Sequence, residues 1–425
     1  MIVKSFVLRI DSVNEIVSQC KYNTISIIRL EQKLNDLFYL LINKSIINKE
    51  AIDNEIIAIT SYLNPLFQDF THNTPLIDFI EFIKGYLTHA ISYNVPISSI
   101  TDYLLAQCTN VCAKAISQLA GVNFMDGREL VVCEDKNNIN SFNWNSTLTN
   151  IRTKCHDKQQ LVISGGYART LKGEVLSIGK GGANLMASLV GAAMNADRIE
   201  LFVDNENVHN VSSITYEEAA HLCSSNSAPF PSIVLWPAKN AHIPIVVKYI
   251  LNNNSEEIII SSIKDETYNN DVSGILVDND LSLITVYGTG LLGHIGASSA
   301  IFSSLAAEKI NIRFISQTTS EFAISFAVSN DNTEKVSNIL NNYIVNNPIV
   351  ALDDIMVIKR EVAVITMYGS RMKNVPGISG KIFSLLGNAG INVIASAQGG
   401  EELSISVVVD LNDTSMAKNI LSTLC

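Results

Sequence analysis

An internal repeat is the strongest constraint on how this chain folds. The segment IFSSLAAEKINIRFISQTTSEFAISFAV begins at Ile301, and the similar segment IFSLLGNAGINVIASAQGGEELSISVVV begins 81 residues later at Ile382. The same offset relates further identical residues: Tyr287 and Tyr368, Gly288 and Gly369, Asn311 and Asn392, Gln317 and Gln398. Identity at several spaced positions with one constant offset predicts two copies of one structural unit.

Each copy has the same order of local patterns. A β-branched run (LITVYG, VAVITMYG) precedes a glycine-bearing turn, and a run with apolar residues three and four apart follows, as at Ile301, Phe302 and Leu305. Two alternating strand patterns complete the copy. We therefore expect two ferredoxin-like units, about 281–350 and 360–425, within a region 263–425. Because each small sheet has an open edge, we expect the two units to pair.

Residues 1–262 show a different alternation of patterns. A strand-like opening, MIVKSFVLRI, is followed by helix-like apolar spacing over about 43–95, then by the strand-like LVISGG, a helix over about 184–194 and the strand-like RIELFV. Alternating strands and helices predict an α/β domain with a mainly parallel sheet between helices.

Composition limits the function classes. A formal charge of −11 argues against a general nucleic-acid binder, and no run approaches the ~18 apolar residues of a membrane span. The seven cysteines include no CxxC pair, which favours free thiols in a reducing compartment. The opening lacks the apolar core and cleavage site of a signal peptide, so we expect a cytoplasmic protein. His156 and His221 lack partners at metal spacing, so we expect no metal site.

A glycine turn in the first region raises the question of phosphate binding. In LSIGKGGANLMA, residues 176–187, the glycines Gly179, Gly181 and Gly182 surround Lys180 just before the expected helix. Backbone N–H groups at a helix N-terminus favour anions. The turn fits neither GxxxxGK[ST] nor GxGxxG, and glycines at such turns also serve close packing. The motif alone leaves both interpretations open.

The repeated units resemble the tandem ACT domains of aspartate kinases. The resemblance rests on GTGLLGHIG followed by IFSSLA in the first copy and on GSRMKNVPGISGKIFSLL in the second. It extends backwards through FMDGREL, LSIGKGG, SITYEEA and PAKNAHIPIVVK, and the second copy is most similar to aspartokinases fused to homoserine dehydrogenase. We expect no dehydrogenase domain, because the sequence ends at Cys425. The resemblance implies an amino-acid kinase fold in which MgATP and aspartate meet at the carboxyl ends of the strands.

The resemblance also implies roles for individual residues, although several motifs are altered. The family's KFGGTS corresponds to KSFVLR, its SxGE to AQCT and its GRGGSD to GKGGAN. By position the resemblance assigns catalytic roles to Lys4, Lys180 and Asp204; nucleotide contacts to Gly179, Gly181, Gly182, Asn184 and Lys248; and substrate contacts to Thr109 and Asn184.

These substitutions remove much of the chemistry that phosphoryl transfer needs. Phe6 and Val7 replace the phosphate-contacting glycines, Thr109 replaces a carboxylate, and Asn184 lacks the family's negative charge. After Asp204 the ADPR portion of the family's nucleotide loop is absent. We therefore prefer a catalytically impaired, amino-acid-sensing homologue. The alternatives are an active aspartate kinase, ATP plus L-aspartate giving 4-phospho-L-aspartate, with feedback by threonine or lysine, and an enzyme with another acceptor.

The ACT pair keeps its characteristic polar residues. The resemblance associates Gln317 and Gln398 with recognition of threonine, and an amide suits a zwitterion because it both donates and accepts hydrogen bonds. We expect effector contacts from Asn311, Gln317, Asn392 and Gln398, with threonine or lysine as effector. The family also implies a homodimer through the ACT domains, and we expect the apolar segment ISVVV to form an exposed strand edge that favours it.

Overall fold

The computed structural model describes most of the chain in two compact units. The described residues are 1–20, 23–47, 52–68, 74–134, 142–156, 160–203, 213–223, 228–249, 257–262, 271–287, 297–317, 323–346 and 355–425. The first unit comprises residues 1–208, 212–219 and 228–264, and the second comprises 209–211, 220–227 and 265–425. The boundary expected at 262/263 adjoins residues 263–270, which lie outside the described residues.

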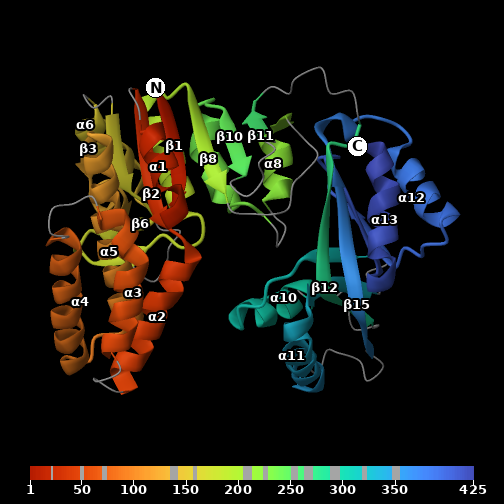
Figure 1. The fold of residues 1–425 in the computed structure, drawn as a ribbon. Coiled ribbons are helices and arrows are strands. Elements are labelled where there is room, and N and C mark those ends of the chain that lie inside the picture. Colours follow the sequence, from red (N-terminus) through yellow and green to blue (C-terminus); the bar gives the residue numbers. More distant parts are fainter. Residues whose placement is uncertain are drawn as a thin grey trace. The chain divides into compact units, whose positions relative to one another are not determined.

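The elements up to residue 262 form an α/β domain (Figure 1). They are β1 (Ile2–Leu8), α1 (Val13–Gln19), β2 (Thr24–Leu30), α2 (Gln32–Ile47), α3 (Ile52–Phe67), α4 (Thr74–Ser92), α5 (Ile97–Ala120), β3 (Asn123–Met125), β4 (Val132–Cys133), α6 (Trp144–Cys155), β5 (Gln160–Ser164), β6 (Tyr167–Thr170), β7 (Val175–Ser177), α7 (Gly182–Met194), β8 (Arg198–Val203), β9 (Ser213–Thr215), α8 (Tyr216–Leu222), α9 (Leu235–Asn240), β10 (Ile245–Tyr249) and β11 (Glu257–Ser261).

One sheet organises this domain. Its order is β3-β5-β2-β1-β8-β10-β11-β9, and every neighbouring pair is parallel except β10 and β11. Helices α2 to α5 bury apolar side chains against β1 and β2 on one face, with Phe38, Ile59 and Leu104 fully buried. Helix α7 packs between the other face and helices α6 and α9. The predicted parallel sheet between helices is confirmed.

The second unit reproduces the sequence repeat element by element. Its elements are β12 (Gly274–Tyr287), α10 (Ala297–Ala307), β13 (Phe314–Gln317), β14 (Ala323–Ser329), α11 (Thr333–Asn346), β15 (Ile355–Tyr368), α12 (Ile378–Asn388), β16 (Ala395–Gln398), β17 (Ser404–Asp410) and α13 (Thr414–Leu421). The bounds of β12, α10, β13 and β14 recur 81 residues later in β15, α12, β16 and β17. The two predicted ferredoxin-like units are therefore present.

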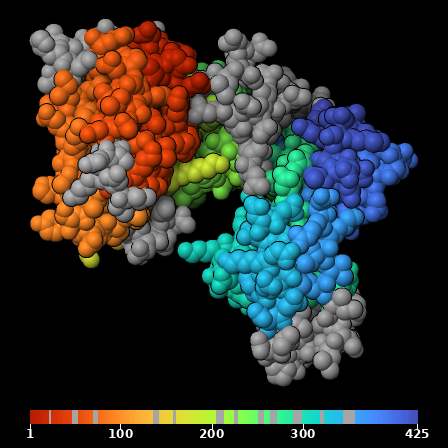
Figure 2. All heavy atoms as spheres, turned by 60° about the horizontal axis from the view of Figure 1, so that its bottom comes forward, coloured from red at the N-terminus to blue at the C-terminus, as the bar shows by residue number. Residues whose placement is uncertain are grey.

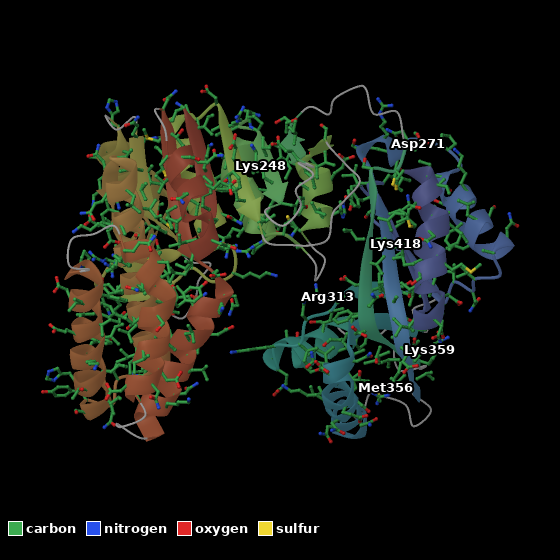
Figure 3. The ribbon with its side chains drawn as sticks, in the orientation of Figure 1. Lys248, Asp271, Arg313, Met356, Lys359 and Lys418 are labelled. Carbon is green, nitrogen blue, oxygen red and sulfur yellow. The ribbon has the colours of Figure 1, made fainter. Side chains whose placement is uncertain are left out.

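The two ferredoxin-like copies exchange halves of their long strands β12 and β15, which the repeat did not predict. All strands form one sheet of order β13-β14-β12-β15-β17-β16. The second half of β12 pairs with β14, whereas its first half pairs only with the half of β15 that joins β17. Conversely, the first half of β15 pairs with the second half of β12, and its Met356 packs in the α10–α11 core (Figure 3). Figure 1 shows β12 and β15 side by side, with α10 and α11 toward one end.

A left-handed residue marks the exchange point in each long strand. Asp280 has φ 58° and Glu361, its repeat partner, has φ 55°. The β12–β15 register shifts at this point, between Asp278 and Leu283. A bulge with one residue in the left-handed region bends a strand and increases its twist. The bulges let each strand leave one small sheet and enter the next.

One expectation about strand edges is wrong. The apolar segment ISVVV lies in β17, which is flanked by β15 and β16 and is not an edge. The edge strands are β13 and β16, and they approach each other, because the Ser316 hydroxyl donates to the Ser396 carbonyl at 3.0 Å. The sheet therefore curls around a third core that includes Leu281, Phe314 and Val408. In Figure 2 the coloured atoms of this unit, from teal to dark blue, lie against one another.

Two further observations concern the whole described chain. No described helix is both long enough and apolar enough to cross a membrane. All seven cysteines have free thiols, and six of them are buried, including Cys108 and Cys112 on α5.

The contact between Gly274 and Tyr368 gives a stability prediction. A Cβ at Gly274 would lie 2.5 Å from the hydroxyl of Tyr368, which is fully buried. Gly274→Ala should therefore destabilise the second unit by about 1–3 kcal/mol, measured as a lowered Tm. Gly387→Ala is the matched control, because nothing lies within 4 Å of its added Cβ and alanine favours a helix. Equal Tm values for the two variants would contradict the prediction.

Candidate functional site

The glycine turn at residues 179–182 lies near the carboxyl ends of strands β2 and β5. Gly165 and Gly166 directly follow β5; the Gly165 N–H donates to the Ile28 carbonyl near the end of β2, and the Gly166 carbonyl accepts from the Ile178 N–H at 2.9 Å. Helix α7 begins at Gly182. The turn and the helix N-terminus are thus held where parallel α/β sheets usually bind ligands.

The turn itself depends on glycine. Gly179 and Gly181 have φ 82° and 76°, in the left-handed region, and a Cβ at Gly181 would lie 2.4 Å from Cδ of Pro231. A pocket of about 40 Å³ adjoins the turn, lined by Lys180 and by apolar side chains that include Phe142 and Ile233. That volume is far below the ~300–1,000 Å³ of small-molecule sites. The outer side of the turn is therefore closely packed.

Asn184 is engaged inside the domain. It is 2% exposed, and its Oδ1 accepts a hydrogen bond from the Ser5 hydroxyl at 2.7 Å. Ser5 lies on β1 and is fully buried. At the position of the family's carboxylate, this chain therefore has the neutral Asn184, and its hydrogen bond with Ser5 joins α7 to β1.

Thr109 is also engaged internally. Its hydroxyl donates to the Leu105 carbonyl one turn earlier at 2.8 Å, and it also bonds the side chain of Tyr167. Burial, reinforced by the negative charge of Asp102, raises the pKa of Tyr167 well above its usual value. Tyr167 lies three residues after the end of β5, so Thr109 lies near the carboxyl end of that strand.

Lys4 and Lys248 converge on a buried carboxylate that the sequence analysis overlooked. Glu200 on β8 is 1% exposed, and its Oε2 lies 3.4 Å from Lys4 Nζ and 3.5 Å from Lys248 Nζ. Its Oε1 pairs with Arg198 at 2.6 Å. Lys248, labelled on β10 in Figure 3, also pairs with Glu257 at 3.0 Å. Strands β1, β8 and β10 are neighbours, so one carboxylate links three strands.

The cations determine the protonation state of this carboxylate. Burial alone would raise the pKa of Glu200, but Lys4, Lys248 and Arg198 together hold that pKa below its usual value. Glu200 is therefore ionised at neutral pH, and it neutralises much of the lysines' charge.

The structure does not bring Lys4 together with Asn184. Lys4 lies within β1, four residues before the strand ends, and consecutive strand residues point to opposite faces. Because Ser5 reaches Asn184 on the α7 face, Lys4 points to the other face, where it also donates to Gln19. Arg9 is the cation that directly follows β1. The apolar residues that continue to Leu8 are the sequence signal that would have shown that β1 ends just before Arg9.

Lys180 and Asp204 are the other two residues with a predicted catalytic role. Lys180 is exposed in the turn, and no ion pair to it is seen among the described residues. Asp204 lies outside the described residues. Within the described ranges, no group of three or more His, Cys, Asp or Glu side chains is placed to hold a metal ion.

The predicted effector residues lie at the two ends of the edge strands. Gln398 ends β16, and its Oε1 accepts from the Ser379 hydroxyl in the first turn of α12 at 3.4 Å. Gln317 ends β13 and is exposed. Asn311 and Asn392 are exposed and precede these strands, six residues before the glutamines.

Comparisons with protein families match both parts of the chain. A model of the amino acid kinase family matches residues 54–249, and a model of the ACT domain matches residues 284–343 and 365–423. The first match begins after β1 and β2 and ends before β11, and the second covers most of both repeat copies.

Curated relatives and solved structures agree with these families. A bifunctional aspartokinase/homoserine dehydrogenase of Haemophilus influenzae is 30% identical over 269 residues, 60% of this chain and 33% of that protein. Aspartokinase 2 of Bacillus subtilis is 25% identical over 60% of this chain and 64% of that protein. The matched part thus spans about a third of the first relative's length.

The solved structures support the fold. Aspartate kinase of Clostridium acetobutylicum superposes with a TM-score of 0.80 at 19% identity, covering 100% of both chains. Aspartokinase III of E. coli, in complex with lysine and aspartate, gives 0.79 at 15% identity, covering 100% of this chain and 99% of that one. The chain therefore belongs to the aspartokinase family, with an amino-acid kinase domain followed by ACT domains.

Proposed function

We propose that this chain is a catalytically impaired aspartokinase homologue that senses a small amino acid through its ACT pair. The observation that carries the proposal is the buried Glu200, which pairs with Lys4 and Lys248, two of the three lysines to which the family resemblance assigns catalytic or nucleotide-binding roles. A phosphate group would have to compete with this internal carboxylate for the same cations. The described residues therefore fit MgATP poorly.

The aspartate site supports the same conclusion. The Thr109 hydroxyl is bonded within its own helix, and the Asn184 side chain is bonded to Ser5. Neither residue carries the negative charge that would hold the ammonium group of aspartate. We further propose a cytoplasmic homodimer formed through the ACT domains, as the family resemblance implies, with threonine or lysine as effector.

An active aspartate kinase is the second candidate. Arg9 favours it, because this cation directly follows β1, where the parallel strands end, and its pairing with Asp11 at 3.5 Å leaves it 29% exposed. The intact glycine turn at the start of α7 also favours it.

The first test is nucleotide binding. We expect no measurable MgATP binding in isothermal titration calorimetry at micromolar to low millimolar concentrations, because Glu200 neutralises Lys4 and Lys248. We also expect no aspartyl hydroxamate when hydroxylamine is added with ATP and aspartate. Micromolar affinity for MgATP together with hydroxamate formation would establish the active kinase instead.

The second test is the charge of Glu200. Since its pKa is lowered in the folded state, its carboxylate stabilises the fold at neutral pH, and this contribution is lost as the pH falls through the lowered pKa. Glu200→Gln should lower the free energy of unfolding at pH 7 by about 3 kcal/mol, and it should flatten the decline of stability below pH ~4.5.

Glu257→Gln is the control for this test. Glu257 is the exposed partner of the same Lys248, so its loss should cost less than about 1 kcal/mol. Parallel stability profiles against pH for Glu200→Gln and the wild type would contradict the assigned role of Glu200.

The third test concerns the effector. We expect threonine or lysine to raise the Tm, since a ligand at 100 times its Kd stabilises by about 2.7 kcal/mol. We expect Gln317→Ala to reduce this shift more than Gln398→Ala, because the Gln398 amide is already engaged by Ser379. No shift with threonine, lysine, methionine or isoleucine at millimolar concentration would leave the ACT pair as an assembly device only.

A further inference from the structure

A pocket of about 390 Å³ opens between helices α3, α4 and α5, on the opposite side of the helical layer from the sheet. Its volume lies within the ~300–1,000 Å³ range of small-molecule sites. Its lining is mainly apolar, with a few polar side chains at the rim: Phe67, Pro75, Asp78, Phe79, Phe82, Gln107, Val111, Lys114, Ala115 and Gln118. None of these residues belongs to the kinase or ACT sites described above.

The pocket follows from how α4 and α5 pack. Near the turn that joins the two helices, Tyr86 and Tyr103 stack with ring centroids 4.8 Å apart, so bulky side chains fill that end. At the other end α5 presents the small Ala115 to α4. Ala115, Phe67 and Phe79 are nearly fully buried and form an apolar floor.

Two opposite charges stand at the rim of this floor. Lys114 projects from α5 and Asp78 from α4, and both side chains are exposed. Within the described part of the chain, neither has an ion-pair partner, whereas neighbouring helix charges such as Lys84 and Asp53 are paired. Gln107 and Gln118 lie on the same face of α5 as Lys114, at helical spacing, and add amide donors and acceptors.

We propose that this pocket binds an α-amino acid with an apolar side chain. Lys114 and the glutamine amides face the carboxylate, Asp78 faces the ammonium group, and the side chain lies on the floor of Phe67, Phe79 and Ala115. A zwitterion matches one cation and one anion at the rim, whereas a plain fatty acid or amine would leave one of the two charges without a partner. This inference is independent of whether the kinase site is active.

The test uses L-leucine as the probe in the full-length Gln317→Ala/Gln398→Ala background, which removes the expected ACT contacts. We expect saturable binding of one leucine per chain by calorimetry. The two matched analogues 4-methylpentanoate and 3-methylbutan-1-amine each lack one charge of leucine and should bind at least about tenfold more weakly. Glycine, which lacks the side chain, should not bind.

Variants locate the binding. Val111→Phe fills the pocket from its half-buried wall and should abolish leucine binding, while circular dichroism checks that the variant is folded. Lys114→Gln and Asp78→Asn change exposed side chains and should each weaken binding about tenfold or more. Lys172→Gln, an exposed lysine far along the chain that does not line the pocket, should leave binding unchanged.

Three results would overturn the proposal. The first is no binding of leucine, methionine or phenylalanine at millimolar concentration. The second is leucine binding that persists in a folded Val111→Phe variant or is unchanged in both charge variants, which would place the site elsewhere. The third is binding of 4-methylpentanoate as tight as that of leucine, because the pocket would then recognise an apolar carboxylate without the ammonium group.

Discussion

The first domain depends on a carboxylate buried in the middle of its sheet. Burying an isolated charge is costly, so Glu200 needs the cations that neighbouring strands supply, and Lys4 on β1 and Lys248 on β10 supply them. Phe202 reinforces this arrangement, since its ring stacks on Phe6 and lies under Lys248. One ionised group thereby fixes the relative position of three central strands. It does so with lysines that the family resemblance assigns to a ligand.

The second unit has a comparable dependence on two strands. Because β12 and β15 each pass from one small sheet into the other, every core of this unit contains residues from at least one of them. The two repeat copies are therefore not separable domains, although each has its own helices. Because β12 and β15 are paired along most of their length, the α10 end and the α12 end of this unit are joined by continuous hydrogen-bonded backbone.

The repeat in the sequence predicted the elements of this unit but not their exchange. A constant offset of 81 residues shows that two segments are alike. It does not show which sheet each half of a long strand joins. The kinase-like domain shows a related limit. Matching KSFVLR to the family's motif assigned a catalytic role to Lys4, whereas Lys4 lies within β1 and Arg9 is the first residue after that strand. Glu200 was visible within RIELFV, but a strand pattern alone does not show that a charge is buried.

The contacts around the glycine turn explain how a kinase fold persists while the proposed catalytic loss proceeds. A catalytic site holds charged groups whose partners arrive with the ligand, and an uncompensated group of this kind costs stability until then. Here the neutral Asn184 is satisfied by Ser5, and Thr109 by Leu105 and Tyr167. Under the proposal, each substitution exchanges an interaction with a ligand for one within the fold. These internal hydrogen bonds join α5, α7 and the sheet, so under the proposed loss of catalysis the fold does not depend on a ligand at these positions.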